Sequence, residues 1–522
     1  MNALNERTRS LWMTELPRPS PALTQNLLTD VVVVGAGLGG LTTAYLLAKA
    51  GRKVAVIDAG VPGGGMTART TAHLTCALDD RWYELIALRG ADDATLAADA
   101  HRSAIDLVEE IQANEDIDCD FVRVDGYLGL ADDDKISTLE RELEASHRVG
   151  LTDVTLERDC NIAGFSACLR FPRQARFHPV KYLRGLIAAI KRDGGQVLGV
   201  RVTEVSGGER ARVQTDAGFV IDAAAAIIAT NTPINDRVAV HTKQAPYRTY
   251  VIAGPIAKGA APDALLWDTG WPYHYVRIQP AVDGMHDVLI VGGEDHKTGQ
   301  ADDMLQRFTA LEHWARARFP DLGRIMWRWS GQVMESVDYL GYLGRNPGKA
   351  DNVFIITGDS GMGMTHCTIG AKIISDAILG RENAWAKLFD PTRVTVKATP
   401  SYVRENLNVA AQMADHVTPG DVSSVADIPL GSGAIVRRGA QKMAVYRRLD
   451  DTIAEHSAVC PHMGCVVAWN PLEECWDCPC HGSQFAADGM VLNGPATSDL
   501  KPVAQETETD QPYGGYRPPA LP

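Results

Sequence analysis

Two short boxes near the C-terminus combine cysteine with histidine at spacings that suit a metal centre. Cys460 and His462 form the first box, Cys478 and His481 form the second, and residues 463–477 separate them. Two thiolates and two imidazoles at this separation can hold a [2Fe–2S] cluster, with the cysteines on one iron and the histidines on the other. Zinc accepts the same donors. The Cys-Pro-Cys-His-Gly-Ser run around the second box is more specific than ordinary zinc spacing, so the iron–sulfur interpretation is favoured.

The bulk composition narrows the class of protein. Five of the ten cysteines fall within residues 460–480, which indicates metal chemistry rather than a disulfide scaffold. The first thirty residues contain no apolar stretch typical of a secretion signal, so we expect a cytoplasmic location. We expect no membrane span, because no run of about 20 apolar residues occurs. The net charge of −14 argues against nucleic-acid binding.

A glycine-rich turn near the N-terminus is typical of a dinucleotide site. In the GxGxxG turn, Gly35 permits the tight bend, Gly37 lets the backbone approach a pyrophosphate, and Gly40 lets helix and strand pack closely. Asp58 ends the next strand, where a carboxylate can accept hydrogen bonds from a ribose. The turn lies in a complete strand–turn–helix–strand unit, with strands expected over 30–34 and 53–57 and a helix over 41–50.

A second glycine-rich loop lies much later in the chain. Residues 352–357 are typical of a buried strand, which leads into Gly358 and Asp359, and a helix is expected over 369–379. A helix N-terminus at such a loop can stabilise negative charge on a bound ring. Residues 63–72 are rich in Gly, Thr and Arg, which can wrap a phosphate and a ring edge. From these two segments we expect further cofactor contacts by Arg69, Thr70, Thr71, Gly361, Met362, Gly363, Met364 and Thr365.

Taken together, the chain resembles the FAD-dependent amine and amino-acid oxidoreductases of the D-amino-acid oxidase type, in the subgroup fused to a Rieske domain. The resemblance implies FAD rather than NAD, with Asp359 and the loop after it holding the pyrophosphate–ribityl part and the flavin edge. It also implies that residues 227–230 return to the FAD domain and that Val202 packs near the adenine. The resemblance is carried by residues 10–12, the glycine turn and residues 69–72, 267–269, 273–277 and 293–299.

The same resemblance implies further features of the cluster. In the Rieske family the positions of Cys465 and Cys480 form a disulfide that joins the two cluster loops. Ser483 stands where a hydroxyl can donate a hydrogen bond to a bridging sulfide, which favours the reduced cluster. High-potential members carry a tyrosine two residues later, where this chain has Phe485. The resemblance therefore implies an intermediate potential.

Candidates for the reaction itself lie on two expected strands. Hydride transfer to a flavin from a carbon next to nitrogen requires that the substrate be positioned and any carboxylate anchored. Residues 273–277 alternate as a strand with Tyr275 and Arg277 on one face, and Arg277 can bind a carboxylate bidentately. His296 and Lys297 follow a strand over 287–292. Because a comparable lysine of the related sarcosine-type oxidases lies beside the flavin and helps oxygen react, the resemblance implies that position for Lys297.

The expected fold class is α/β, with a FAD-binding Rossmann-like domain, an inserted α+β substrate domain and a small all-β Rieske domain. We expect a lead segment at 1–29, the oxidoreductase domain at 30–390 and the insertion at roughly 81–350. A linker at 391–425 is expected because periodicity is lost there and prolines are frequent. The Rieske domain is expected at 426–508 and an irregular tail at 509–522.

The resemblance implies an enzyme that oxidises an amine or amino acid with FAD and passes single electrons through the cluster to an external acceptor. The expected partners are a small-molecule substrate and a one-electron carrier protein. Two alternatives stay open. Electrons can run in reverse, from a reduced carrier through the cluster to FAD, or the protein can be a redox sensor. The inserted domain favours an enzyme, because a pure electron carrier needs no substrate site.

Overall fold

The N-terminal domain is built on a parallel sheet with both faces covered. The computed structural model describes residues 6–235, 240–281, 283–348 and 351–503. The first sheet has the main order β16-β17-β10-β1-β2-β7, in which only β16 runs antiparallel to its neighbour, and an antiparallel β8–β9 pair branches from β10. Residues 31–34 form its centre because β-branched side chains pack well when both faces of a strand are buried. The strands are β1 (Leu27–Val34), β2 (Val54–Asp58), β7 (Gln196–Gly199), β10 (Val220–Ile228), β16 (Tyr342–Arg345) and β17 (Val353–Thr357).

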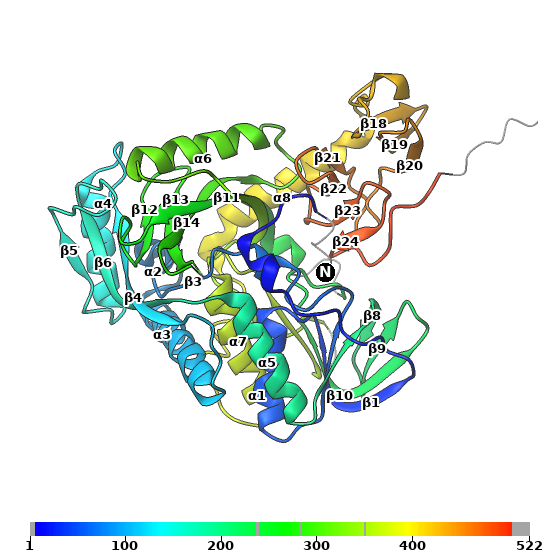
Figure 1. The fold of residues 1–522 in the computed structure, drawn as a ribbon. Helices are drawn as coiled ribbons and strands as arrows, with labels where there is room; N and C mark the ends of the chain where they lie inside the picture. The colour runs from blue at the N-terminus through cyan, green and yellow to red at the C-terminus, as the bar shows by residue number, and fades with distance from the viewer. Residues whose placement is uncertain (1–5, 236–239, 282, 349–350, 504–522) are drawn as a thin grey trace, which may run out of the picture.

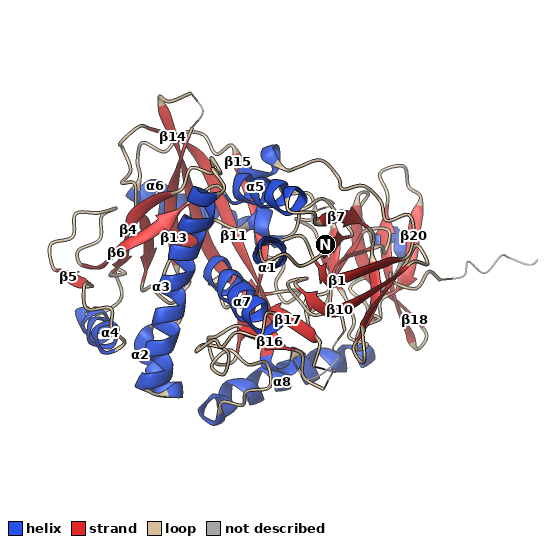
Figure 2. Cartoon of the chain, turned by 90° about the horizontal axis from the view of Figure 1, so that it is seen from below, coloured by secondary structure: helices blue, strands red, loops and turns tan. Residues whose placement is uncertain are grey.

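Helices cover one face of this sheet and a hairpin covers the other. On one face α1 (Leu38–Lys49) packs between α5 (Pro179–Arg192) and α7 (Gly363–Ile378), as Figures 1 and 2 show. On the opposite face apolar side chains of β8 (Val202–Ser206) and β9 (Ala211–Thr215) pack against those of β1, β2 and β17. The N-termini of α1 and α7 both follow glycine-rich loops, as expected from the sequence.

A second sheet forms the inserted domain. Its order is β15-β11-β14-β13-β12-β4-β6-β3, with β5 added beside β6, and α6 (Met304–Arg318) packs on β11 and β14. The helices α2 (Trp82–Arg89), α3 (Ala91–Asn114) and α4 (Ile136–Arg148) complete this part of the fold. The strands are β3 (His73–Leu74), β4 (Val122–Gly129), β5 (Thr155–Glu157), β6 (Cys168–Arg176), β11 (Gln244–Ala257), β12 (Leu265–Asp268), β13 (His274–Pro280), β14 (His286–Lys297) and β15 (Trp327–Ser336).

The insertion is divided in two, which corrects the single insertion expected over 81–350. The chain leaves the first sheet after β2, returns with α5 and the strands β7 to β10, and leaves again for β11 to β15. The return of the chain to the first sheet is fixed by hydrogen bonds, because β10 pairs in parallel with β1 and Val33 lies opposite Ile227. Residues 227–230 therefore run back into the FAD-type domain, as the resemblance implied.

The C-terminal domain consists of two small antiparallel sheets. One contains β18 (Ser432–Arg438), β19 (Gln441–Arg447) and β20 (Ile453–Ser457), and the other contains β21 (Ala468–Asn470), β22 (Cys475–Asp477), β23 (Gln484–Ala486) and β24 (Val491–Asn493). The two cysteine–histidine boxes lie in loops around the second sheet. Residues 504–508 and the tail expected at 509–522 fall outside the described residues.

The segment expected as a linker contains a helix. α8 (Thr399–Met413) occupies much of residues 391–425 and runs along one edge of the molecule toward the C-terminal domain (Figure 2). Its Val409 and Met413 pack against the core of that domain. Pro400 does not oppose the helix, because it stands in the first turn, where a proline removes no helical hydrogen bond. The sequence had suggested irregular structure because no residue of α8 is fully buried, so its apolar periodicity is weak.

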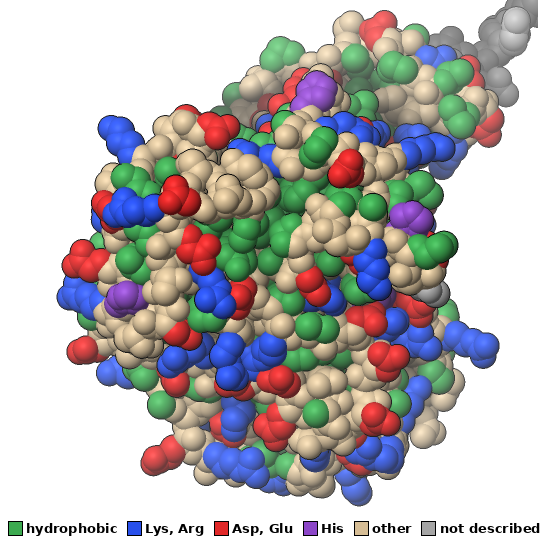
Figure 3. Space-filling model, turned by 60° about the vertical axis from the view of Figure 1, so that its left-hand side comes forward, with side chains coloured by type: hydrophobic (Ala, Val, Ile, Leu, Met, Phe, Trp, Pro, Cys, Tyr) green, Lys and Arg blue, Asp and Glu red, His purple; other side chains and the backbone are tan. Residues whose placement is uncertain are grey.

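The surface carries charges of both signs. Figure 3 shows Lys and Arg interspersed with Asp and Glu over the face that it presents, without a broad basic patch. Within the described ranges, no helix combines the length and the apolar composition needed to cross a membrane.

Candidate functional site

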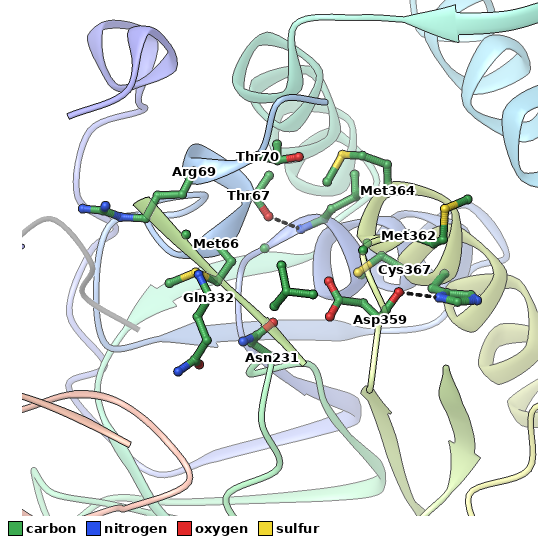
Figure 4. Close-up of a pocket in the computed structure, with 18 of the residues that line it drawn as sticks. Met66, Thr67, Arg69, Thr70, Asn231, Gln332, Asp359, Met362, Met364 and Cys367 are labelled. Carbon is green, nitrogen blue, oxygen red and sulfur yellow. Dashed lines mark hydrogen bonds between the residues drawn. The ribbon is translucent and has the colours of Figure 1, made fainter. Parts of the chain in front are cut away.

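A cavity lies between the two sheets of the N-terminal domain (Figure 4). Its walls come from the turn after β1, the 3-10 turn η3 (Met66–Arg69), β13, β15 and the start of α7. The sequence had separated these segments by up to about 300 residues, and the fold brings them to one place. The expected site residues on the wall are Gly35, Gly37, Asp58, Arg69, Thr70, Thr71, Tyr275, Gly358, Asp359, Gly361, Met362, Gly363 and Met364.

The glycine turn has the geometry that a pyrophosphate needs. Gly35 has φ +109°, and a Cβ there would lie 2.4 Å from the carbonyl oxygen of Ala229. A Cβ on Gly40 would lie 1.9 Å from the carbonyl oxygen of Gly35, so α1 packs directly onto the turn. Gly37 is the N-cap of α1 and lines the cavity. The helix N-terminus therefore faces the cavity with its backbone N–H groups, as anion binding requires.

A second cavity continues the first at the adenine end. Asp58 and Gly35 lie on the walls of both, and Val202 lies on the wall of the second alone. Asp58 accepts hydrogen bonds from the backbone N–H of Ala36 at 2.7 Å and of Gly60 at 2.8 Å, which orients its carboxylate at the end of β2. The two cavities together have the elongated arrangement that an adenine dinucleotide fits.

The far wall of the second cavity comes from the C-terminal domain. Residues 490–494, 496 and 497 lie opposite Val200, Arg201 and Val202. No motif in the sequence predicted this closure, because β24 and the loop after it carry no recognisable ligand pattern. The C-terminal domain thus supplies one wall of the second cavity.

The loop before α7 forms the other end of the main cavity. Asp359 Oδ1 accepts a hydrogen bond from the backbone N–H of Met334 at 3.1 Å, and burial raises the pKa of Asp359 to about 6. His366 lines the same end, and its Nδ1 donates to the carbonyl oxygen of Asp359 at 2.8 Å. Thr365 is not on the wall: its buried hydroxyl donates to the carbonyl oxygen of Met362 at 3.1 Å and contacts His101. The expected cofactor contact by Thr365 stays a prediction.

Arg69 turns its guanidinium away from the main cavity (Figure 4). The group donates to the carbonyl oxygens of Ser330 at 2.8 Å and Thr8 at 3.0 Å, and it pairs with Glu6 at 2.8 Å. It also lies 3.4 Å from Glu473 in the C-terminal domain. Neighbouring carboxylates therefore balance the charge of Arg69, while the residue itself stays on the cavity wall and its expected cofactor contact stays a prediction.

Two tyrosines stand on the wall near the expected flavin end. The hydroxyls of Tyr275 and Thr249 hydrogen-bond at 2.6 Å, and Tyr273 donates to Asp295 at 3.3 Å. The two tyrosine rings lie 5.6 Å apart between centroids. Burial raises the pKa of Tyr275 well above its ordinary value, so the phenol stays protonated. Tyr275 is thus placed where a substrate would lie.

Arg277 lies beyond the cavity, and its guanidinium is bound by neighbouring parts of the chain. Its guanidinium donates to the carbonyl oxygens of Ala72 and Phe177 at 3.0 Å each, and to the side chain of Gln279 at 2.6 Å. The side chain is 1% exposed. Arg277 therefore ties β13 to neighbouring segments, which corrects its expected role as an anchor.

His296 and Lys297 also lie away from the main cavity. His296 bonds through Nε2 to the Tyr250 hydroxyl at 2.8 Å, and its Nδ1 donates to the carbonyl oxygen of Lys297 at 2.7 Å. Lys297 pairs with Glu405 of α8 at 2.5 Å. The expected position of Lys297 beside the flavin is wrong, because β14 carries it past the cavity to α8.

The four expected cluster ligands converge at one end of the C-terminal domain. The thiols of Cys460 and Cys478 contact each other, and the rings of His462 and His481 lie 4.9 Å apart. Buried His481 Nδ1 has no hydrogen-bond partner among the described residues, as a ring nitrogen reserved for a metal requires. These thiolate and imidazole donors fit a [2Fe–2S] cluster with mixed ligands.

The loops that carry these donors are held from several sides. A disulfide joins Cys465 to Cys480, so the two loops are cross-linked. Ser483 is fully buried, and its hydroxyl hydrogen-bonds the Cys460 thiol. A second disulfide, between Cys160 and Cys168, joins the start of β6 to the loop before it, and the sequence had not suggested it because these cysteines stand outside any motif.

The N-terminal domain meets the cluster end through two residues that sequence reasoning missed. The ring of His241 lies 4.8 Å from the ring of His462 and 5.7 Å from that of His481. Gln332 lines the main cavity, and its Nε2 donates to the carbonyl oxygen of Gly482 at 2.9 Å. Neither residue belongs to a motif. Only the docked arrangement of the two domains identifies them.

A buried ion network holds the two domains together. Arg248 lies 3.3 Å from Asp477 and 3.7 Å from Glu473, both of the C-terminal domain. Glu473 also accepts a hydrogen bond from Ser330 at 2.6 Å. All five members of the network, Glu6, Arg69, Arg248, Glu473 and Asp477, have side chains at most 1% exposed.

Comparisons with known proteins match both halves of the chain. The family model described as FAD dependent oxidoreductase matches residues 30–377, and the model described as Rieske [2Fe-2S] domain matches residues 418–504. The Bacillus subtilis (strain 168) protein YhfW, named as a Rieske 2Fe-2S iron-sulfur protein, is 30% identical over 508 residues. That match covers 95% of this chain and 98% of YhfW.

Two further matches cover the N-terminal part. Gamma-glutamylputrescine oxidoreductase of Escherichia coli (strain K12) is 25% identical over 407 residues, covering 74% of this chain and 93% of that protein. The crystal structure of glycine oxidase from Geobacillus kaustophilus superposes with a TM-score of 0.57 at 18% identity. It covers 71% of this chain and 100% of the other, and at that identity the likeness shows the fold alone.

Proposed function

Since the chain belongs to the family of FAD-dependent oxidoreductases and carries a Rieske [2Fe–2S] domain, we propose that it oxidises an amine or amino acid and passes the electrons from FAD to the cluster. When bound, FAD would supply the hydride acceptor, and the cluster would accept one electron at a time. The substrate loses a hydride from carbon and a proton from nitrogen and becomes an imine. Its two electrons then leave singly for an external acceptor.

The residues of the chain position the reacting atoms. The glycine turn and the N-terminus of α1 hold the pyrophosphate, and Asp58 accepts from the ribose. The α7 N-terminus directs its positive dipole end to the ring that carries negative charge after reduction. Tyr275, fixed by Thr249, and Tyr273, fixed by Asp295, line the space where the substrate would lie.

The observation that carries this proposal is the contact of Gln332 with both cofactor sites. Its side chain lines the cavity for the flavin and donates to Gly482, the residue after the cluster ligand His481. His241 adds a second contact, against both histidine rings. A short route from flavin to cluster is therefore available inside one chain.

The same contact bears on the two alternatives. A redox sensor requires no cavity with two tyrosines beside the flavin ring, so the cavity supports an enzyme. The reverse route and our proposal both bring an external carrier to the cluster, so the burial of His481, which is 3% exposed and faces His241, bears on both alike. In our proposal the histidine edge receives electrons from the flavin, and a carrier protein docks elsewhere on the C-terminal domain. The order in which the two cofactors are reduced decides the direction.

Anaerobic stopped-flow reduction of the intact protein tests the proposal. A panel of amines and amino acids is mixed with the oxidised protein, and the flavin and cluster absorption bands are followed together. We expect the flavin band to bleach first and the cluster band to follow. Cluster reduction by a one-electron donor, with electrons then appearing on the flavin and no reduction by any substrate, would instead support the reverse route.

A further inference from the structure

A side cavity adjoins the main cavity next to its tyrosines. The two share Asp79 and Tyr273, so the side cavity, which we call the vestibule, is continuous with the space for the substrate. It lies between the loop after β12, the end of β15 and α8. Its polar and aromatic lining consists of Asp79, Asp80, Arg81, Tyr247, Trp271, Tyr273, Asp295, Glu335, Tyr339, Arg404 and Glu405.

The carboxylates of the vestibule are short of partners. One oxygen of Asp295 accepts from Tyr273, while the other, Oδ1, is buried without a hydrogen-bond partner in the described part of the chain. The nearby Thr249 hydroxyl bonds Tyr275 instead. A buried carboxylate oxygen of this kind is costly unless a donor reaches it. Asp295 lines the vestibule, so its carboxylate is available at the wall of this cavity.

The acidic groups also face one another. Glu335 lies near Asp79, Asp80 and Asp295, and burial with this mutual repulsion raises the pKa of Glu335 well above its ordinary range. Burial likewise raises the pKa of Asp79 to about 6, of Asp80 to about 8 and of Asp295 to about 7. Burial is the first cause of each shift, and repulsion from neighbouring acids adds to it.

The cations of the vestibule are already engaged. Arg81 donates to the carbonyl oxygens of Asp79 at 2.5 Å and Asp268 at 2.9 Å. Arg404 has a side chain 73% exposed and lies 3.3 Å from Glu405, which also pairs with Lys297. The vestibule therefore offers a surplus of carboxylates, and neither arginine is directed at a bound carboxylate.

Aromatic rings complete the site for a cation. Tyr247, Tyr273, Tyr339 and Trp271 stand among the acids, and ammonium groups bind to such ring faces as well as to carboxylates. The main cavity gives no better anchor for an anion, since the guanidinium of Arg69 points away and Arg277 is bound to backbone carbonyls. A substrate with a carboxylate next to its amine would find no partner there.

From this arrangement we propose that the vestibule binds the distal ammonium group of a diamine or polyamine, whose other amine lies beside Tyr273 and Tyr275 for oxidation. This inference names the substrate class and rests on the function proposed above. Glu335, Asp80 and Asp295 hold the distal charge, and the aromatic rings enclose the methylene chain between the two nitrogens. The distance between the nitrogens then sets the preference among substrates.

Equilibrium dialysis of the oxidised holoenzyme tests binding separately from turnover. The probes are 1,4-diaminobutane, 1-aminobutane, which lacks the second ammonium, and 4-aminobutanoate, which carries a carboxylate in its place. We expect the diamine to bind at least about tenfold more tightly than either, equivalent to about 1.4 kcal/mol. Equal binding of the diamine and 1-aminobutane would overturn the vestibule proposal, whether or not any of them reduces the flavin.

Variants locate the charge that is recognised. Glu335→Gln should weaken 1,4-diaminobutane binding about tenfold, while binding of 1-aminobutane changes less than twofold. Asp80→Asn provides a second variant should Glu335→Gln lose flavin, and Asp132→Asn, an exposed acid far along the chain, is the matched control. Unchanged diamine binding in both vestibule variants would refute the site. Vestibule-dependent binding without flavin reduction by any amine would instead refute the proposed oxidation.

Discussion

Replacing Arg69 by methionine should loosen the contact between the two domains. Arg69 has a fully buried side chain that joins the N-terminal segment, β15 and the C-terminal domain through Glu6, Thr8, Ser330 and Glu473. Methionine fills a similar volume and removes the charge and all of its hydrogen bonds. The substitution therefore leaves the buried carboxylates with a single guanidinium, that of Arg248.

The magnitude follows from the charges of the network. The network pairs two guanidiniums with three carboxyl groups. Burial already raises the pKa of Glu6. Arg69 and Arg248 hold the pKa of Glu473 below its ordinary value. Removing one partner from a buried ion pair costs about 3–5 kcal/mol. That cost corresponds to roughly a hundredfold to several thousandfold more of the undocked form.

Release of FAD reports undocking, because residues 490–497 close the adenine end of the site. The assay follows the fluorescence of free FAD after dilution into moderate urea, together with limited proteolysis between residues 414 and 425. We expect Arg69→Met to release FAD at least about tenfold faster than the parent. This factor is smaller than the free-energy cost of about 3–5 kcal/mol would allow.

Arg184→Met is the matched control. Arg184 pairs with Glu15 at 2.7 Å, but both side chains are about half exposed, and such a pair contributes only about 0–1 kcal/mol. Its FAD release should stay close to that of the parent. If Arg69→Met released FAD no faster than Arg184→Met, the buried network would not be what holds the domains together.

Three further outcomes are expected. Burial raises the pKa of Asp295 to about 7, above the unfolded value of about 3.9, so the parent loses stability from this group as pH rises from about 4 to about 7. The Tm of Asp295→Asn minus that of the parent should therefore increase over this range, and a constant difference would contradict the assignment. Gln332→Leu removes the donor to Gly482 and should slow cluster reduction more than flavin reduction in stopped-flow traces; equal slowing would place Gln332 in the flavin site alone. A chain that ends at residue 417 should lose FAD faster than the full chain during gel filtration, and equal retention would show that residues 490–497 do not close the site.

The sequence predicted well those features whose chemistry depends on residues close together in the chain. The turn from Gly35 to Gly40 and the two cysteine–histidine boxes need particular residues at fixed spacing, so a short stretch of chain identifies them. Val202 was placed by resemblance, and it lies on the wall of the second cavity. Its contact with the adenine stays a prediction, as do the cytoplasmic location and the identity of the electron acceptor.

The residues that were misplaced depend on partners distant in sequence. Arg277 alternates correctly on its strand, but whether its guanidinium meets a substrate or backbone carbonyls depends on Ala72 and Phe177. Lys297 pairs with Glu405 of α8, which is more than a hundred residues later in the chain. Glu405 lies in a segment that was expected to be irregular. Single residues such as Gln332 and His241 belong to no motif, so only the docked fold reveals their positions.

The closure of the adenine end by residues 490–497 has a consequence for how a cell makes the finished protein. These residues are synthesised after the whole of the N-terminal domain, and domains generally fold as units beginning with the N-terminal one. Docking of the cluster domain therefore adds a wall to the second cavity and narrows the access to it. We expect flavin to enter faster before docking than after it, so that shortage of riboflavin yields docked molecules that take up flavin slowly. Shortage of iron would instead leave molecules that hold flavin while the C-terminal domain lacks its cluster.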